Sequence, residues 1–440
     1  MENHPKDTAP KQSHVPTISR VCTDTLVELV YDPVARKTAL AVSRFGGLWN
    51  VEQEVRIETG EILVPYRATN NLIANECVLL PSLPEEFGFK HELIADIRSF
   101  LHRYVDLSPA FEQAAAYYVL LSWVHDAFNE LPYLRLRGDY GTGKTRALMI
   151  LGSLCYKSFF ASGAASTSPI FHTLDTFGGT LIYDEADLPL SDARADMVKI
   201  LNTGNLKGIP VLRTIVNRNK EFNPRAFKVF GPKIVAMRGS FEDRALESRF
   251  LTEETATHLM RPDVPIILPP AFRVEALTLR NRLLHFRLCH FFDIKADGTA
   301  LMDKVEPRVN QIALSLLSLA DDPDERSAIQ DAFIAQHRNA VSARQESIEG
   351  HVLAAILKVF RVLTAPHVTL RDVTDNFNRA HCGEYPRPMS NRWIGQIVRA
   401  RLMLKTERTN GIYVIPVTEW PKVQALASRF GLVTEEQATA

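Results

Sequence analysis

The alternation of apolar and polar residues changes character several times along the chain. Residues 21–88 contain short apolar pieces, such as LVELVYD and TALAVSRF, between Gly, Pro and Asn turns, which predicts a small β-rich N-terminal domain. In residues 89–130 the apolar positions recur at helical spacing (IADIRSFLHRYVDL and FEQAAAYYVLLSWVHDAF), which predicts a helical linker. Residues 1–20 show neither pattern, so we expect a disordered tail.

Residues 131–268 have the pattern of an α/β domain. Apolar runs of strand length (YLRL, KSFFASG, TLIY and PKIVAM) alternate with segments of helical spacing, as in a parallel sheet covered by helices. Before the last of these runs, two extended pieces flank the polar stretch NRNK at 217–220. This arrangement predicts a β-hairpin with a basic tip.

Two helical modules complete the chain. Three helices are predicted in residues 269–344, and three more in residues 345–420. The latter are followed by Asn410-Gly411 between two extended runs, which is a strong hairpin signal. Three helices and a hairpin form the winged-helix arrangement, whose third helix enters the major groove of DNA. Residues 421–440 predict a closing helix and a C-terminal tail.

Composition excludes several classes of protein. The 440 residues are 46% hydrophobic and 23% charged, as in ordinary globular proteins, and 51 Lys+Arg balance 51 Asp+Glu, so any nucleic-acid surface must be local. Five distant cysteines without a CxxC pair suggest neither a disulfide framework nor a zinc site. There is no apolar run of membrane-span length, and the start has no signal-peptide core. We therefore expect a cytoplasmic protein without a membrane partner.

The stretch GDYGTGKT is the strongest candidate for chemistry. It lies between an apolar strand and a helix, where a glycine-rich turn and free helix N–H groups form a phosphate cradle. Lys144 is expected to reach the β- and γ-phosphates, and the Thr145 hydroxyl to bind Mg²⁺, so the predicted cofactors are ATP and Mg²⁺. The other interpretation is a glycine-rich turn between two core elements. The cofactor-binding candidates are Gly138, Asp139, Tyr140, Gly141, Thr142, Gly143, Lys144 and Thr145.

An acidic pair follows the apolar strand TLIY. Asp184 and Glu185 would lie at the carboxyl edge of the parallel sheet, where ligands of open α/β folds bind. Asp184 would hold Mg²⁺ through water, and Glu185 would orient and deprotonate the attacking water. The alternative is an acidic surface turn after a core strand.

The order of these features resembles the AAA+ ATPases. The chain has a phosphate loop, a DEAD-type acidic strand, a basic hairpin before the next strand and the string Glu247-Ser248-Arg249-Phe250. Together these features resemble the hairpin-bearing helicase clade that includes the minichromosome maintenance proteins. The overall order is most similar to the replication helicases of integrative mobile elements. The resemblance covers about residues 132–418 and implies a P-loop AAA+ core, a helical lid in residues 269–344 and a homo-oligomeric ring, a hexamer.

The resemblance also implies roles for several arginines. Arg249 is identified as the trans arginine finger that reaches the neighbouring subunit's nucleotide, with Arg244 as the competing finger. A surface ion pair of Arg249 with Glu247 or Glu253 is the alternative. Arg238 occupies the place of the first sensor, where the family more usually has Asn, Thr or Ser.

The second sensor and the pore loop are assigned in the same way. Arg308 is the best match for the lid sensor, with Arg280 and Arg282 as runners-up that the sequence does not separate. Arg218 and Lys220 at the hairpin tip correspond to the loop that grips single-stranded DNA in the central pore. A solvated basic turn is the other interpretation.

The winged-helix segment is locally basic. Its third helix is N-capped by Ser390, and only Glu407 opposes the cations there, so duplex DNA is the expected partner. A winged helix used for protein contacts is the alternative. The DNA-binding candidates in this segment are Arg392, Arg399, Arg401, Lys405 and Arg408.

Three functions fit these features. The leading one is an ATP-driven DNA helicase or translocase that acts as a ring in the replication of a mobile element or phage. The second is a replication initiator or helicase-loader ATPase. The third is a nucleotide-switched regulatory or defence ATPase whose winged helix contacts protein.

Overall fold

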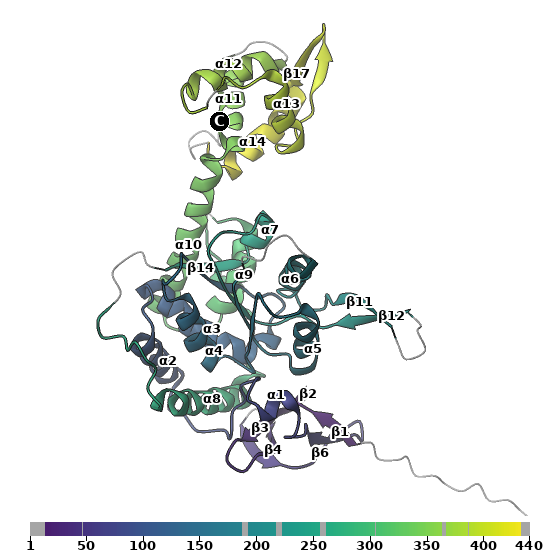
Figure 1. Ribbon diagram of the computed structural model, residues 1–440, viewed down its shortest axis with the longest axis vertical. Helices are drawn as coiled ribbons and strands as arrows, with labels where there is room; N and C mark the ends of the chain where they lie inside the picture. The colour runs from purple at the N-terminus through teal and green to yellow at the C-terminus, as the bar shows by residue number, and fades with distance from the viewer. Residues whose placement is uncertain are drawn as a thin grey trace, which may run out of the picture. The chain divides into compact units, whose positions relative to one another are not determined.

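The computed structural model describes residues 14–45, 47–186, 192–216, 222–255, 261–303, 305–362, 367–385 and 387–432 (Figure 1). The chain divides into two compact units, Met1–Phe333 and Ile334–Ala440. Helix α10 (Pro323–Gln345) belongs partly to each. Among the described residues, no helix is long and apolar enough to cross a bilayer.

The first unit begins with two small sheets. The four-stranded sheet has the order β2(Ser19–Val21)-β3(Thr25–Asp32)-β4(Lys37–Arg44)-β5(Leu48–Glu52), and the three-stranded sheet has the order β1(His14–Thr17)-β7(Ile62–Pro65)-β6(Val55–Arg56). A short helix, α1 (Asn71–Ala74), follows. The prediction of a disordered tail is wrong for residues 14–20, because β1 pairs with β7 and β2 pairs with β3. Residues 1–13 lie outside the described residues.

A five-stranded parallel sheet forms the centre of the first unit, as the α/β pattern predicted. Its order is β14(Phe250–Glu254)-β8(Tyr133–Arg137)-β13(Lys233–Met237)-β10(Leu181–Asp184)-β9(Phe159–Ser162). Because β13 pairs with both β8 and β10, the loops after these three strands meet at one edge of the sheet. Ligands of open parallel sheets bind at this carboxyl edge.

Helices and a hairpin connect these strands. They are α4 (Lys144–Leu154), α5 (Thr167–Phe177), α6 (Asp192–Thr203), α7 (Arg244–Glu247) and the hairpin of β11 (Val211–Val216) and β12 (Phe222–Phe227). Helix α4 lies tightly on the sheet at Gly152, where an added Cβ would be 2.7 Å from the Phe160 ring. The hairpin strands pair antiparallel, as the sequence predicted.

The segment 89–130 is not a linker. It contains α2 (Lys90–Tyr104), α3 (Pro109–Val124) and the short helix η1 (His125–Ala127). Every residue of α3 from Phe111 onward is buried, so α3 is a core helix. A helix that is apolar on all sides requires such burial.

The segment 269–344 contains the three expected helices, α8 (Ala271–His290), α9 (Pro307–Leu317) and α10, and the short helix η2 (Gly298–Ala300). They do not form a separate domain. Helix α8 packs on α2, α3 and α4, and α9 packs on α3, so both share the core of the first unit (Figure 1). The division between the units falls within α10.

After α10, the described part of the second unit contains four α-helices and a small sheet. Its elements are α11 (Ile348–Val362), β15 (His367–Thr369), α12 (Leu370–Ala380), α13 (Asn391–Ala400), β16 (Glu407–Thr409), β17 (Ile412–Pro416), η3 (Val417–Glu419) and α14 (Trp420–Arg429). Asn410 and Gly411 have φ of 52° and 81°, as the two-residue turn of the predicted β16–β17 hairpin requires. Helix α14 buries Val423 and Ala427 and lies where the sequence predicted a closing helix.

Candidate functional site

The loop after β8 leads directly into α4 and lines a cavity of about 590 Å³. Gly143 caps α4 with φ of 86°, and Gly141 has φ of 73°, a backbone region that favours glycine. The first helical N–H groups of α4 therefore face the loop. The cavity is lined by Tyr140, Gly141, Thr142, Gly143, Lys144, Thr145, Arg146, Gly163, Asp184, Glu185, Ala236, Met237 and Arg238.

Gly138 and Asp139 support this loop from behind and are not among the lining residues. The Lys144 ammonium donates to their carbonyl oxygens, at 2.7 Å for Gly138 and 2.5 Å for Asp139. Thr142 and Thr255 share a hydroxyl–hydroxyl hydrogen bond of 2.7 Å. A Cβ at Gly138 would lie 2.1 Å from the Thr255 hydroxyl, so this glycine is needed for close packing.

The two predicted metal ligands lie together. The Thr145 hydroxyl at the start of α4 donates to Asp184 Oδ2 at the end of β10, over 2.7 Å. A hydroxyl and a carboxylate are hard oxygen donors, the kind that Mg²⁺ prefers, and they lie beside Lys144 in one cavity. The donor set therefore fits the predicted Mg²⁺.

Glu185 has an uncommon backbone conformation. Its φ is 58°, and its N–H donates to Asp184 Oδ1 over 2.9 Å. A non-glycine residue in the left-handed region costs about 1 kcal/mol or more, and such residues cluster at functional sites. Here the turn keeps both carboxylates of the acidic pair on the cavity wall.

Arg238 follows the central strand β13 and also lines the cavity. Its guanidinium lies over the ring of Tyr140, 3.8 Å from the ring centroid. This cation–π contact holds Arg238 against the phosphate loop. The strand order thus brings the predicted first sensor next to the predicted cradle.

Arg249 is buried within its own chain. Its side chain donates to Asn202 on α6, its Nε is buried without a hydrogen-bond partner among the described residues, and the residue is 9% exposed. Burial lowers its pKa, and the nearby Arg308 lowers it further. The surface ion pair that was the alternative for Arg249 is not formed.

The two carboxylates considered for that pair have other partners. Glu253 accepts from the N–H and hydroxyl of Ser108, at 2.6 and 2.7 Å. Glu247 accepts two hydrogen bonds from Arg135, at 2.5 and 2.8 Å.

Sequence analysis missed Arg135. Its side chain is 4% exposed and comes from β8, the strand before the phosphate loop. Its pairing with Glu247 ties α7, which carries the exposed Arg244, to this strand. The available signal was a charged residue in the middle of the buried run YLRLR.

The predicted lid arginines are not in the cavity wall. Arg280 is buried and donates to the carbonyl oxygens of Leu80 and Ser153, so its role is structural. Arg282 pairs with Glu85 and Asp96. Arg308 is close enough to Arg249 to lower the pKa of Arg249, and its Nε is buried without a partner among the described residues.

The structure describes five of the seven predicted DNA contacts. Arg218 and Lys220 lie outside the described residues. Arg392, Arg399, Lys405 and Arg408 are exposed on α13 and the hairpin region.

Arg401 is also exposed, and it forms an ion pair of 2.9 Å with Glu349 of α11, which the sequence did not reveal. Ser390 caps α13 as predicted.

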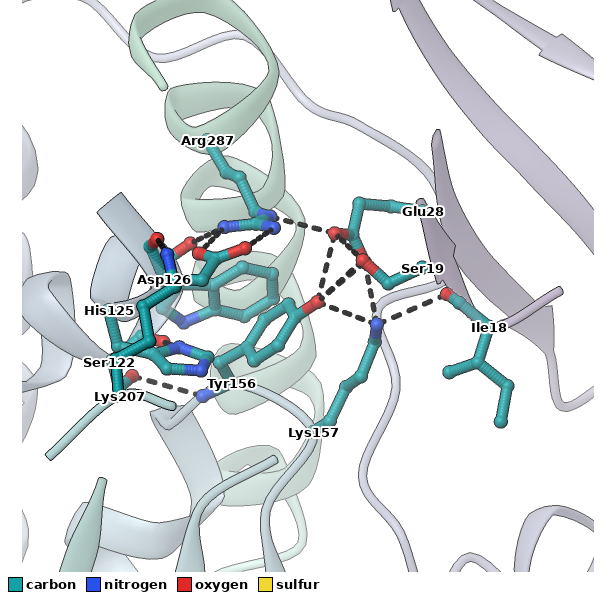
Figure 2. Close-up of polar contacts among 11 residues, drawn as sticks. Ile18, Ser19, Glu28, Ser122, His125, Asp126, Tyr156, Lys157, Lys207 and Arg287 are labelled. Carbon is teal, nitrogen blue, oxygen red and sulfur yellow. Dashed lines mark hydrogen bonds and ion pairs between the residues drawn. The ribbon is translucent and has the colours of Figure 1, made fainter. Parts of the chain in front are cut away.

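A buried cluster of charges connects the N-terminal sheet to the core of the first unit (Figure 2). Glu28 of β3 accepts from Arg287 Nε of α8 over 2.7 Å and pairs with Lys157 Nζ over 2.7 Å. Arg287 also forms two hydrogen bonds with Asp126, at 2.7 and 2.8 Å. The hydroxyl of Tyr156 lies between Lys157 and Glu28 (Figure 2).

Burial and pairing act against each other in this cluster. Burial would raise the pKa of Glu28, but the charges of Lys157 and Arg287 more than offset this and lower it. For Lys157 burial is the stronger effect, and its pKa is lowered in spite of Glu28. Glu28, Lys157 and Arg287 are at most 1% exposed, so we assign the cluster a structural role.

Comparison with known proteins shows that this chain is similar to several solved structures. No protein-family model matches the sequence, and no curated protein matches it. The NrS-1 C-terminal region is 12% identical with a TM-score of 0.39, covering 89% of this chain and 96% of that chain. The SCCmec type IV Cch active helicase is 12% identical with a TM-score of 0.36, covering 95% and 96%. The Aeropyrum pernix ORC1 protein in complex with DNA is 11% identical with a TM-score of 0.19, covering 81% and 95%.

Proposed function

We propose that this chain is an AAA+-type ATPase that moves DNA as a ring-shaped helicase or translocase in the replication of a mobile element or phage. One observation carries the proposal. The phosphate loop and the acidic strand meet in one cavity, where the Thr145 hydroxyl contacts the Asp184 carboxylate beside Lys144. This is the combination of groups that phosphoryl transfer from a nucleoside triphosphate requires.

Five of the residues that line the cavity then have roles in hydrolysis. Lys144 and the first N–H groups of α4 bind and orient the β- and γ-phosphates. Thr145 and Asp184 would hold Mg²⁺, which neutralises phosphate charge when bound. Glu185 takes a proton from the attacking water. Arg238, which follows β13 and lines the cavity, would contact the terminal phosphate.

The arginine supplied to a neighbouring subunit is better assigned to Arg244 than to Arg249. Arg249 is 9% exposed and donates to Asn202, so it would have to leave these surroundings to reach another chain. Arg244 begins the short helix α7, which ends two residues before Arg249, and it is exposed. An arginine in trans can raise the hydrolysis rate by about 10³-fold or more.

DNA binding in the second unit is assigned to α13 and the hairpin. Their exposed cations are Arg392, Arg399, Lys405 and Arg408. Such residues neutralise phosphates and make affinity depend on salt. We propose that this unit is a winged helix that binds duplex DNA, while the β11–β12 hairpin contacts the single strand.

ATP hydrolysis measured without DNA and with single-stranded, duplex and forked DNA tests the proposal. Lys144→Ala should abolish nucleotide binding, and Glu185→Gln should bind ATP without hydrolysing it. Arg20→Gln, which changes an exposed arginine in the N-terminal sheet, is the control and should leave the rate unchanged. Stimulation by DNA with separation of the fork supports a helicase. Stimulation without strand separation supports an initiator or loader, and no stimulation contradicts a DNA motor.

A mixing experiment tests the shared site. Arg244→Ala should retain ATP binding and lose hydrolysis. Adding Lys144→Ala chains, which still carry Arg244, should restore part of the rate if neighbouring chains complete one another's sites. Without recovery, the site is complete within one chain, and the ring proposal loses its basis.

A further inference from the structure

Two histidines and a glutamate of the second unit lie close to one another. His351 comes from α11, and His381 and Glu384 from the turn after α12. One ligand atom of each side chain lies within 4.8 Å of the others. The imidazole rings stack at 4.1 Å between centroids, and His381 Nδ1 is 2.8 Å from a Glu384 carboxylate oxygen. Among the described residues, this is the one such group of three.

The polar atoms of this group are not all satisfied. His351 Nδ1 is buried and has no hydrogen-bond partner among the described residues. Buried polar nitrogens nearly always have a partner, so this atom requires an explanation. A metal ion bound by the group would supply one.

The surrounding structure holds the other two side chains in place. The ring of Phe377 packs against His381, 4.8 Å between centroids. Gly383 has φ of 89°, which allows the chain to turn so that Glu384 returns toward His381. The His381 N–H also donates to the Phe377 carbonyl oxygen over 3.0 Å, which anchors this turn to α12.

We propose that His351, His381 and Glu384 bind one Zn²⁺, with water as the fourth ligand. Two imidazoles and a carboxylate suit zinc and do not suit Mg²⁺ or Ca²⁺, which prefer oxygen ligands. Tetrahedral zinc with bonds of about 2.0–2.1 Å places its ligand atoms about 3.3 Å apart. The separation of the three atoms, up to 4.8 Å, exceeds this by up to about 1.5 Å, so binding requires side-chain rotations that turn the stacked rings and bring the atoms together. Glu384 is exposed, so water can reach the fourth position.

The ion would join parts of the unit that are distant in sequence. His351 lies on α11, whereas His381 and Glu384 lie in the connection from α12 to α13. Fixing this connection would stabilise the second unit and limit motion at the start of α13. The proposed zinc site does not depend on the proposed ATPase function. Its three ligands include no cysteine, so the spacing of the cysteines did not indicate it.

Calorimetric titration of the full-length, tag-free chain with Zn²⁺, after treatment with a chelator, tests this proposal. We expect one Zn²⁺ per chain with a dissociation constant below about 1 μM, and the visible absorption of tetrahedral Co²⁺ when Co²⁺ replaces it. His351→Gln and Glu384→Gln should each weaken binding at least tenfold. Glu384 is exposed, so its variant should melt like the parent chain in chelator.

Two matched controls separate this site from adventitious binding. Cys382→Ser changes the thiol next to His381, and His367→Ala removes another histidine of the same unit. Both should bind Zn²⁺ as the parent chain does. The proposal is wrong if the parent chain binds no Zn²⁺ at micromolar concentration, or if these controls lose as much affinity as the ligand variants. The three side chains would then be an aromatic and hydrogen-bonded cluster.

Discussion

Replacing Glu28 with glutamine tests how the N-terminal sheet is held to the core. The Glu28 carboxylate is 1% exposed and contacts Arg287, Lys157 and Tyr156 at 2.7–2.9 Å. Glutamine has nearly the same shape but no charge. The variant therefore leaves two buried cations, Lys157 and Arg287, with one counter-charge fewer (Figure 2).

The magnitude follows from the remaining partners. Removing one member of a buried ion pair costs about 3–5 kcal/mol. Arg287 keeps its two hydrogen bonds to Asp126, so the loss falls mainly on Lys157, and we expect about 3 kcal/mol. Lys157→Met should cost less than Glu28→Gln, because burial already outweighs the pairing of Lys157 and because Glu28 keeps Arg287.

Native-state amide hydrogen exchange on peptides from β3 and β4 measures the local free energy of opening in the full chain. The double variant Glu28→Gln/Lys157→Met should be more stable than Glu28→Gln alone, since it no longer contains the cation that lost its partner. Glu61→Gln is the matched control, because Glu61 forms an ion pair with Arg20 at the surface, at 3.1 Å. It should change the free energy by less than about 1 kcal/mol.

Two results would refute this reasoning. One is a Glu28→Gln variant whose β3 and β4 amides exchange no faster than those of Glu61→Gln. The other is a double variant that is less stable than Glu28→Gln alone. Either would mean that the buried charges do not depend on one another.

Three further changes have defined outcomes. Gly152→Ala forces a Cβ to within 2.7 Å of Phe160, so the free energy of urea unfolding should fall by about 1–3 kcal/mol. Burial lowers the pKa of His125 to about 4, so between pH 6.5 and 4 the unfolded chain binds more protons than the folded chain, and the free energy of unfolding falls as pH falls. His125→Asn should remove up to about 3 kcal/mol of this pH dependence, measured by urea titrations at several pH values. Arg135→Met frees Glu247 and α7, so nucleotide binding should persist while hydrolysis slows; unchanged hydrolysis would contradict a positioning role.

The elements of the nucleotide cavity were predictable because their signals are local. The phosphate loop is recognisable from the stretch GDYGTGKT between an apolar strand and a helix, because its backbone geometry is set by neighbouring residues. The role of Asp184-Glu185 after TLIY is predictable because ligands usually bind at the carboxyl ends of parallel strands. The Asn410-Gly411 turn was predictable for the same reason, since both residues tolerate positive φ.

What the sequence did not reveal concerns burial and distant pairing. The segment 89–130 was expected to link domains, yet α3 is buried on all sides. Arg249 was expected to face a neighbouring chain, yet Asn202 of α6 binds it. Arg401 was counted as a DNA contact, but Glu349, 52 residues earlier, pairs with it. These outcomes depend on which surfaces meet after the elements pack.

The amino-acid pattern was sufficient to locate most strands and helices around the central sheet, the Asn410-Gly411 turn and the phosphate loop, because each arises from residues within a few positions of one another. It was not sufficient for the partners of the charged side chains. Glu28 meets Arg287 across 259 positions, and Arg135 meets Glu247 across 112. A charge is tolerated in the interior only where packing supplies a counter-charge or hydrogen-bond partners, and a one-dimensional pattern does not contain that information.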